Sequence, residues 1–209
     1  MRHLIIIGAG GHGKVVADIA FKNGQYERIS FLDDYCVDKV LGCDIIGKIA
    51  NYKEYISEAD FIVAVGNSPK RQLIQNELQL SGARIISLIH PAAVIAFGVK
   101  LGVGCVVAAA AVIGPDTQIG DGVIINTACS VDHDCTVGDF SHISIGAHLA
   151  GSVSIGCQTM VGAGAVVKNG ISICDDCLVG AGAVVVKDIF EKGTYVGVPA
   201  KKMLCDKCE

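Results

Sequence analysis

The sequence predicts an α/β domain followed by an all-β domain along a chain of 209 residues. In the first ninety residues, short apolar runs alternate with helical patterns, which is typical of a small Rossmann-like parallel sheet. From Ile95 to Val185, an aliphatic residue recurs at every sixth position without a miss. A period of six fits neither a helix nor an alternating strand, and it is typical of a parallel β-helix built from hexapeptides. We expect the boundary near His90, which gives domains 1–90 and 91–209.

Four apolar runs and two helices are expected in the N-terminal domain. The runs 4–7, 29–32, 61–65 and 84–88 are predicted to be strands, and 14–23 and 69–80 to be helices. Pro69 suits the first turn of the second helix. On the first helix, Val15, Val16, Ile19 and Ala20 are expected on the buried face. Residues 35–59 show no clear pattern and are candidates for the determinants of substrate specificity.

A glycine-rich segment follows the first predicted strand. Gly8 to Gly13 satisfies the pattern G-x-G-x-x-G, and Asp33 lies twenty residues beyond it. Glycines let the backbone approach a phosphate, and the N-terminus of the following helix favours negative charge. An acid at the end of the second strand can accept a hydrogen bond from a ribose or a base. The domain is too short for a full NAD fold, so a nucleotide-sugar site is favoured over NAD or a structural remnant, with His12 beside the phosphates or the sugar.

In the second domain, three hexads are expected to close one triangular coil, and coils stack at about 4.8 Å. The aliphatic position then points inward, and the position four later, small or slim, lies near a corner. Glycine often follows the aliphatic residue, and we expect it where a turn needs a positive φ. Outward apolar residues predict a face buried in a closed homo-oligomer, for which a trimer of parallel prisms is the natural geometry. They are Val106, Val112, Ile124 and Ile145.

Ten cysteines are present, and several occupy the small inward register, where a thiol behaves as a compact hydrophobe. Cys174/Cys177 and Cys205/Cys208 both form C-x-x-C pairs, a spacing found in zinc sites. Because the register of Cys177 commits it to the interior, the four thiols are not expected to converge. We therefore predict no metal, and leave a weak metal or redox role open for the C-terminal pair.

Bulk properties exclude several partners. The net charge is −4 and no basic run occurs, which argues against nucleic acid. No apolar stretch reaches the ~18 residues of a membrane span, and the first residues lack the apolar core of a secretory signal. Reduced thiols fit a cytosolic compartment, so a cytoplasmic location is expected.

A polar cluster in the repeat is the candidate catalytic centre. His133 lies between Asp132 and Asp134, and a histidine beside carboxylates suits general-base chemistry. Adjacent residues of a strand point to opposite faces, so contact between ring and carboxylate requires a bend. His133, His142 and His148 fall in successive hexads and hence on three faces. They cannot meet within one coil stack, whereas an interface between chains would let His133 of one chain face His142 of another.

These residues resemble a known family over residues 3–203. The motifs are the hexads, Asn126-Thr127, His133-Asp134, Gly138–His142, Gly197–Lys201, Gly8–Gly13 and Phe31–Asp34. Together they resemble the left-handed β-helix acyltransferases. Within them the chain is similar to the nucleotide-sugar N-acetyltransferases of the sialic-acid and bacillosamine type, including the perosamine N-acetyltransferases. The resemblance implies a left-handed β-helix that trimerises, with active sites between adjacent subunits.

The resemblance also implies roles for individual residues. His133 would be the general base, oriented by Asp134 where the family commonly has Glu, with Asn126 near the reacting centre. The co-substrate would be acetyl-CoA, and no metal is implied. The residues matching its binding positions are His142, Gly151, Gly162, Gly180, Pro199 and Lys201. The residues expected on the nucleotide-sugar side are Gly10, Gly11, His12, Asp33, Asp34, Gly66 and Asn67.

The expected reaction is acetyl-CoA-dependent N-acetylation of a nucleotide-linked amino sugar, with a UDP-4-amino-4,6-dideoxy hexose favoured by the resemblance. The sequence leaves the nucleotide open among UDP, GDP and CMP. O-acetylation of a sugar of the sialic-acid type is the first alternative. The others are a zinc hydratase, which needs three convergent histidines, and a nucleotide-binding scaffold without catalysis.

Overall fold

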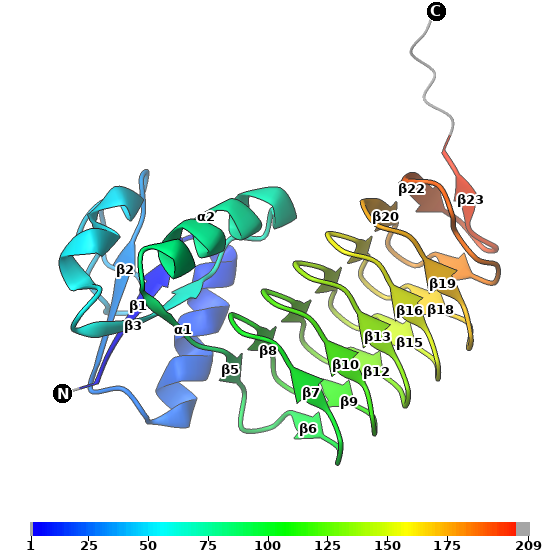
Figure 1. Ribbon diagram of the computed structural model, residues 1–209, viewed down its shortest axis with the longest axis horizontal. Helices are drawn as coiled ribbons and strands as arrows, with labels where there is room; N and C mark the ends of the chain where they lie inside the picture. The colour runs from blue at the N-terminus through cyan, green and yellow to red at the C-terminus, as the bar shows by residue number, and fades with distance from the viewer. Residues whose placement is uncertain (1, 204–209) are drawn as a thin grey trace, which may run out of the picture.

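The computed structural model describes residues 2–203, and it consists of an α/β domain beside a long parallel β-solenoid (Figure 1). The predicted order of an α/β domain and a parallel β-helix is therefore confirmed. Cys205 and Cys208 lie outside the described residues. Within residues 2–203, neither helix is long and apolar enough to cross a membrane.

The N-terminal domain is a four-stranded parallel sheet with the strand order β2-β1-β3-β4. Helix α1 packs on one face of this sheet, and helices α2 and η1 pack on the other. Because all strands are parallel, their carboxyl ends meet at one edge, where the loops to α1 and α2 begin. The elements are β1 (His3–Ile7), α1 (Gly11–Asn23), β2 (Arg28–Leu32), η1 (Ile49–Tyr55), β3 (Ala59–Val63), α2 (Ser68–Leu80) and β4 (Arg84–Ile85).

Three details of the prediction for this domain are wrong. Helix α1 begins at Gly11 rather than at residue 14, so His12 lies in its first turn. Val15 is exposed, because the buried face of α1 consists of Gly13, Val16, Ala17, Ile19 and Ala20. The predicted strand 84–88 is two elements: β4 pairs with β3, whereas β5 (Leu88–Ile89) pairs with β8 of the solenoid. Ser87 makes the transition, because its hydroxyl donates to Gly102 O and accepts from the N–H of Cys105.

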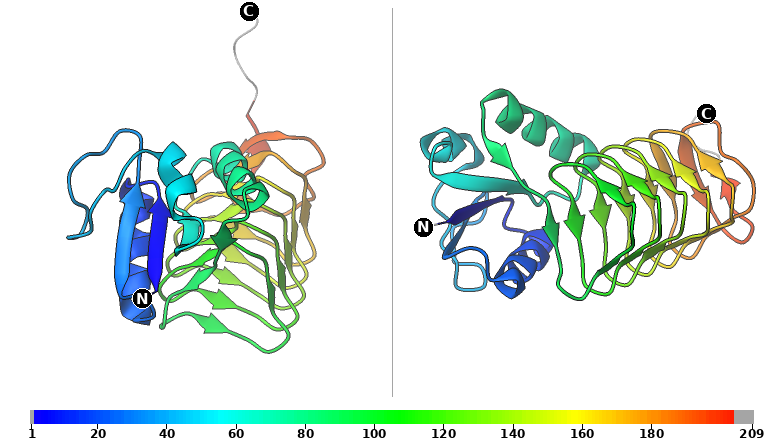
Figure 2. Two further views of the ribbon diagram at one scale, coloured as in Figure 1. Left: turned by 60° about the vertical axis from the view of Figure 1, so that its left-hand side comes forward. Right: turned by 60° about the horizontal axis from the view of Figure 1, so that its bottom comes forward.

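The solenoid has three faces, which Figure 2 shows from two sides, and its strands are parallel except β23, which pairs antiparallel with β22. The docked sheet contacts the N-terminal domain and comprises β5, β8 (Val106–Val107), β11 (Ile124–Ile125), β14 (His142–Ile143), β17 (Met160–Val161), β20 (Cys177–Val179), β22 (Gly193–Val196) and β23 (Lys201–Lys202). The valine sheet comprises β6 (Val94–Ile95), β9 (Val112–Ile113), β12 (Ser130–Val131), β15 (His148–Leu149), β18 (Val166–Val167) and β21 (Val184–Val185). The third sheet comprises β7 (Lys100–Leu101), β10 (Gln118–Ile119), β13 (Thr136–Val137), β16 (Ser154–Ile155) and β19 (Ser172–Ile173).

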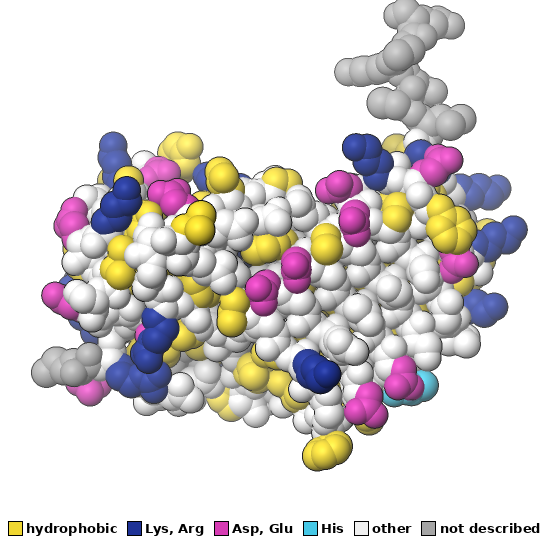
Figure 3. All heavy atoms as spheres, viewed as in Figure 1, with side chains coloured by type: hydrophobic (Ala, Val, Ile, Leu, Met, Phe, Trp, Pro, Cys, Tyr) yellow, Lys and Arg dark blue, Asp and Glu magenta, His cyan; other side chains and the backbone are white. Residues whose placement is uncertain are grey.

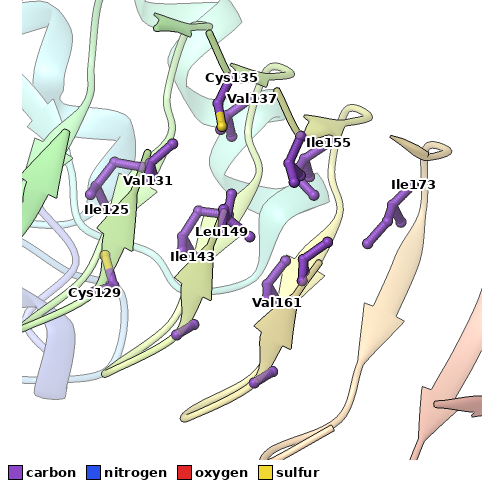
Figure 4. Packing of buried hydrophobic residues seen from close by; sticks show 14 of the residues in the cluster. Ile125, Cys129, Val131, Cys135, Val137, Ile143, Leu149, Ile155, Val161 and Ile173 are labelled. Atoms are coloured by element: carbon purple, nitrogen blue, oxygen red, sulfur yellow. The ribbon is translucent and has the colours of Figure 1, made fainter. Parts of the chain in front are cut away.

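The inside of the solenoid is filled as the hexads predict. From β5 to β21, the aliphatic residue that ends each strand points inward and stacks on its copies in the neighbouring coils (Figure 4). The corner register is buried too, and Cys129 and Cys135 fill it beside Val131 and Val137. Burial raises the pKa of Cys129 to about 12, so this thiol is uncharged at neutral pH and packs as a small apolar group.

Glycine follows the inward aliphatic residues because the coils stack closely there. The prediction that these glycines provide a positive φ is wrong. A Cβ on Gly138 would lie 2.7 Å from the backbone nitrogen of Cys157 in the next coil. The positive φ values occur three residues after the aliphatic position, and they include non-glycine residues such as Asp134, with φ +57°. The turn therefore forces an αL conformation even where an ordinary side chain is present.

The outward columns of the three faces differ in chemistry. Val106 and Ile124 lie on the docked sheet and are buried within this chain, Val106 in an apolar cluster shared with the N-terminal domain, so their assignment to an interface between chains is wrong. On the valine sheet, Val94, Val112 and Val166 are 59%, 43% and 38% exposed. The third sheet carries a polar column: Lys100, Gln118, Thr136, Ser154 and Ser172. One apolar face of the solenoid is thus left uncovered.

Acidic side chains are spaced along the solenoid in the space-filling view (Figure 3). Three aspartates accept backbone N–H groups of the coil that precedes their own: Asp121 from Val103 at 2.9 Å, Asp139 from Asp121 at 2.8 Å and Asp175 from Cys157 at 2.7 Å. These carboxylates link neighbouring coils at one corner, and their hydrogen-bonding capacity is used by the backbone of the solenoid.

Candidate active site

His133 and Asp134 form a hydrogen-bonded pair at the corner between β12 and β13. The ring Nδ1 and the carboxylate Oδ2 are 2.8 Å apart, and both side chains are exposed. The bend that this contact requires is present, because Asp134 is in the αL conformation and its N–H donates to Pro115 O. A carboxylate can only accept, so in the neutral ring Nδ1 carries the proton and Nε2 can accept one. The hydrogen bond that His133 donates to Asp134, with the charge of Asp132, raises the pKa of His133.

Gly151 lies against the ring of His133. A Cβ on this glycine would come within 2.5 Å of both Cε1 and Nε2 of the ring. The N–H of Ser152 also donates to the carbonyl of His133 at 2.9 Å. The coil that contains Gly151 therefore fixes where the ring can lie, and Gly151 leaves the space for it.

A second cluster lies on the docked sheet, under the N-terminal domain. Asn126 Nδ2 and His142 Nε2 are 3.0 Å apart, and the Asn126 carbonyl oxygen accepts the N–H of Thr127. Burial and the charges of His12 and Arg71 lower the pKa of His142 to about 4. Burial and Arg71 likewise lower the pKa of His12 to about 4, and its Nε2 is buried without a hydrogen-bond partner in the described structure.

The structure does not bring His133 and Asn126 together within one chain. Asn126 follows β11 at one edge of the valine sheet, and His133 follows β12 at the other edge. His148 lies on the valine sheet between them, with Nδ1 2.8 Å from the hydroxyl of Ser130. The three histidines of the solenoid therefore have three different sets of partners.

The glycine-rich loop leads from β1 into α1. Gly8 has φ +104°, and a Cβ on Gly13 would lie 2.2 Å from Gly8 O, so both glycines are required by the turn itself. Gly10 is the N-cap of α1 without a side-chain cap, and Gly11 follows it. Both are exposed with open space where a Cβ would be, so the backbone N–H groups of the helix N-terminus are accessible.

Asp33 and Asp34 organise the neighbouring loops. Asp33 Oδ2 accepts the N–H of Ala9 at 2.7 Å, and Oδ1 accepts those of Tyr35 and Cys36. Burial opposes ionisation of Asp33, but these backbone donors outweigh it and lower its pKa. Asp34 Oδ1 accepts the N–H of Ile49. Asp33 already holds the glycine-rich loop in place, so a hydrogen bond to a ribose would be a second role for the same carboxylate.

Gly66 and Asn67 lie where β3 leads into α2. Asn67 caps α2, its side chain accepting the N–H of Lys70 at 2.9 Å. A groove of about 360 Å³ runs from these residues across the docked sheet, lined also by Met160, Leu178 and Gly193. Met160 stacks directly on His142, so the groove adjoins the Asn126–His142 cluster.

The residues matched to the acetyl-CoA side are spread along the upper coils. A Cβ on Gly162 would lie 2.6 Å from Val179 O, and one on Gly180 would lie 2.7 Å from Val196 Cγ1. Coil stacking alone therefore requires both glycines. Pro199 follows a cis peptide bond and is exposed, and Lys201 lies exposed in β23.

Sequence reasoning missed Arg71, which is fully buried between α2 and the solenoid. Its guanidinium donates to carbonyl oxygens of both domains, including Val65 O and Gly122 O at 2.8 Å. The signal was present in the helix periodicity, because Arg71, Ile74 and Leu78 share one face of α2 at spacings of three and four. An arginine on the buried stripe of a helix predicts a specific polar contact.

Comparisons with known proteins cover different parts of the chain. The sequence model of the PglD N-terminal domain family matches residues 3–78. UDP-N-acetylbacillosamine N-acetyltransferase of Bacillus subtilis (strain 168) is 33% identical over 113 residues, which are 52% of this chain and 52% of that protein. The chain thus matches about half the length of that relative.

Two sets of solved structures are similar over nearly their full length. The acetyltransferase domain of PglB from Neisseria gonorrhoeae FA1090 is 41% identical, with a TM-score of 0.95 over 97% of this chain and 100% of that one. A structure of the same domain in complex with acetyl coenzyme A is 42% identical, with a TM-score of 0.94 over 97% and 99%. A histidine-to-asparagine variant of perosamine N-acetyltransferase from Caulobacter crescentus, in complex with CoA and GDP-perosamine, is 35% identical, with a TM-score of 0.94 over 97% of both chains.

Proposed function

The chain belongs to the PglD-type nucleotide-sugar N-acetyltransferases, which acetylate nucleotide-linked amino sugars with acetyl-CoA, and we propose that His133 is the general base of this reaction. The single observation that carries the proposal is the His133–Asp134 hydrogen bond of 2.8 Å, on an exposed corner of the solenoid. As the sugar amine attacks the thioester carbonyl, Nε2 of His133 accepts the amine proton. The C–S bond then breaks, and CoA leaves as the thiol, its sulfur taking up that proton. Asp134 holds the ring in the required tautomer and stabilises the imidazolium that forms.

The second part of the proposal is a homotrimer assembled through the valine sheet. This face exposes Val94, Val112 and Val166, whereas the first coils of the docked sheet are covered by the N-terminal domain and the third sheet is polar. Ser130 and His148 interrupt this outward column between Val112 and Val166, but the face is otherwise valine, and an exposed apolar face is typical of a protein interface. Three prisms that turn the same face toward one axis form a closed assembly.

Such an assembly would complete the active site. His133 and Asn126 flank opposite edges of the valine sheet, so the edge of one chain would meet the opposite edge of the next. His133 of one chain would then face Asn126 and His142 of its neighbour. The burial of His12 beside His142 supports this placement, because it brings the first turn of α1 to the same corner.

We propose that the amino-sugar nucleotide binds at the carboxyl ends of β1 and β3. Gly10 and Gly11 offer free backbone N–H groups for the phosphates, and His12 would face the sugar. Asp33 and Asp34 would shape this site through the loops that they organise, and Gly66 and Asn67 would form its other side. The favoured substrate is a UDP-linked 4-amino-4,6-dideoxy hexose, with the GDP-linked sugar as the neighbouring candidate.

Acetyl-CoA would lie along the solenoid between two chains. His142 and Gly151 are proposed near the thioester and the pantetheine, and Gly162, Gly180, Pro199 and Lys201 toward the rest of the molecule. The exposure of Pro199 and Lys201 supports this course. We further propose a cytoplasmic location, which the eight free cysteines among the described residues support.

A thiol-release assay tests the reaction class and the substrate together. Acetyl-CoA is supplied with UDP- and GDP-linked 4-amino sugars, CMP-sialic acid and free sialic acid. Turnover with one amino-sugar nucleotide is expected. Turnover with sialic acid alone would replace N-acetylation with O-acetylation, and no turnover with any acceptor would contradict the assignment of the substrate class.

A further inference from the structure

Helix α2 runs beside the solenoid (Figures 1 and 2). Its polar side chains Arg71, Gln72 and Gln75 contact successive coils. A helix advances about 5.4 Å per turn, close to the ~4.8 Å between coils, so neighbouring turns can reach neighbouring coils. The contacts are Gln75 Nε2 to Val103 O at 3.2 Å, Arg71 Nε to Gly122 O at 2.8 Å, Arg71 Nη2 to Phe140 O at 2.6 Å and Gln158 Nε2 to Gln72 Oε1 at 2.7 Å.

Arg71 differs from the two glutamines because it binds both domains at once. On the side of the β3–α2 loop, Nη1 donates to Val65 O at 2.8 Å and Gly66 O at 3.1 Å, and Nη2 donates to Ser68 Oγ at 3.3 Å. On the side of the solenoid, Nε and Nη2 donate to two coils. The guanidinium therefore fastens the loop that ends in Asn67 to the coils that carry His142.

The charge of Arg71 has no carboxylate partner among the described residues. The ion pairs in residues 2–203 do not include it, and all its contacts are carbonyl or hydroxyl oxygens. Burial lowers the pKa of Arg71 to about 10, so it is still a cation at neutral pH. A buried unpaired cation is a poor way to stabilise an interface that apolar side chains could fill. An apolar side chain could stabilise this interface as well, but it could not donate hydrogen bonds to both domains as the planar guanidinium does.

We propose that Arg71 is a positioning residue that sets the distance between the nucleotide-sugar loops and the solenoid residues Asn126 and His142. This inference rests on the proposed function, since it places the acceptor on one side of the clamp and the acetyl donor on the other. Misplacement of bound reactants by about 1 Å can cost a hundredfold in rate. A clamp with five N–H donors, shared between the loop and two coils, suits that requirement.

Kinetics of Arg71→Lys test the geometry. Lysine keeps the charge but cannot donate in a fork to both domains. We expect the KM for the amino-sugar nucleotide to rise about tenfold and kcat to fall by a similar factor, while the KM for acetyl-CoA stays within about twofold. The matched control is Gln72→Ala, which removes another contact between α2 and the solenoid without touching the β3–α2 loop. It should leave all three constants within about twofold of wild type.

The pH dependence of the nucleotide-sugar KM in Arg71→Gln tests the effect of the Arg71 charge. His12 from α1, His142 from β14 and Arg71 from α2 are the titratable groups that face one another here. Loss of the Arg71 charge should raise the pKa of both histidines, so the nucleotide-sugar KM should begin to rise at a higher pH than in wild type. Arg71→Lys should keep the wild-type profile. A residue that served only to hold the fold would not separate the two variants in this way.

Wild-type turnover in the same assay is the reference, and its absence would contradict the proposed function rather than the role of Arg71. Given wild-type turnover, Arg71→Lys with unchanged constants, or with equal loss toward both substrates, would overturn the inference. Should a variant not fold, Arg71→Ala is prepared and assayed with methylguanidinium, which can occupy the vacated site. Recovery of the nucleotide-sugar KM with added methylguanidinium is expected, and recovery of folding without recovery of KM would overturn the inference.

Discussion

The imidazole of His133 and the carboxylate of Asp134 are 2.8 Å apart although the two residues are adjacent in the chain. Neighbours in a strand would point to opposite faces. Here the αL conformation of Asp134, held by the hydrogen bond to Pro115 O of the preceding coil, turns both side chains to the same corner. The pair is therefore a product of coil stacking, and the stack fixes its geometry.

Replacement of the ring should remove catalysis and leave binding intact. His133→Ala is expected to lower kcat by about 10²–10⁴-fold, because the amine proton loses its acceptor. The Kd for the amino-sugar nucleotide, measured by calorimetry, should stay close to the wild-type value. A variant that turns over at nearly the wild-type rate would exclude His133 as the base.

Replacement of the carboxylate should shift the pH dependence. The hydrogen bond that His133 donates to Asp134 raises the pKa of His133, and only the neutral ring can accept a proton, so activity falls as the pH drops through that raised pKa. Asp134→Asn lowers the pKa, and the acidic limb of kcat/KM should move to lower pH. The maximal kcat should fall about tenfold, since an amide no longer enforces the tautomer.

Asp132→Asn is the matched control for that variant. Asp132 acts on the ring only through its charge, while its Oδ1 accepts the N–H of His133. The acidic limb should move in the same direction by a smaller amount, with little loss of maximal kcat. An equal shift in both variants would mean that the Asp134 hydrogen bond has no special role.

Gly151→Ala should displace the catalytic ring without changing its chemistry. The added Cβ would lie 2.5 Å from the ring, so the imidazole must move. We expect kcat to fall about 10–100-fold, with the KM for the nucleotide sugar nearly unchanged. Thermal melting close to that of wild type would show that the coil is intact, and an unchanged kcat would mean that the ring need not occupy this position.

The hexads predicted the solenoid correctly because every copy of the pattern reports the same inward contact, as for Val131 and Val137. What the pattern could not show is which outward column the chain's own N-terminal domain covers. Val106 and Ile124 look like interface residues in the sequence and are buried internally, whereas Val112 is exposed. Such coverage depends on how two domains dock, and local periodicity carries no information about docking.

The sequence allowed the residues of the candidate site to be identified, but not the contacts that these residues make with one another. His133 and Asp134 stood out as a polar cluster, but their contact depends on an αL turn that a residue nineteen positions earlier stabilises. Asn126 was grouped with His133 by resemblance, yet within one chain it contacts His142 instead. The periodicity of α2 indicates a buried Arg71 but not its partners, because the solenoid carbonyls that it binds lie more than fifty residues away and no sequence motif marks them.

Mixed trimers test whether the site is shared between chains. His133→Ala and Asn126→Ala chains, each nearly inactive alone, are co-expressed with different tags and the mixed species is isolated. If each site takes His133 from one chain and Asn126 from its neighbour, every isolated mixed trimer has one complete site of its three, so about a third of the sites are restored. A mixture no more active than its parents would place the whole site within one chain.

Acid sensitivity should arise where the N-terminal domain meets the docked sheet. His12 and His142 have folded-state pKa values of about 4, below the ordinary 6.5, because burial and Arg71 disfavour their charged forms. Below pH 6.5 the unfolded chain therefore binds more protons than the folded one at these two groups. Each should remove about 1.4 kcal/mol of unfolding free energy per pH unit until the pH reaches about 4.

Urea unfolding between pH 7 and 4.5 measures this slope, and His142→Asn provides the comparison. Asparagine can retain a polar contact with Asn126 but has no proton to bind, so the variant should lose stability less steeply as the pH falls. His148→Asn is the matched control, because His148 is exposed on the valine sheet. It should keep the wild-type slope. A wild-type slope in His142→Asn would mean that His142 is not held neutral by burial between the domains.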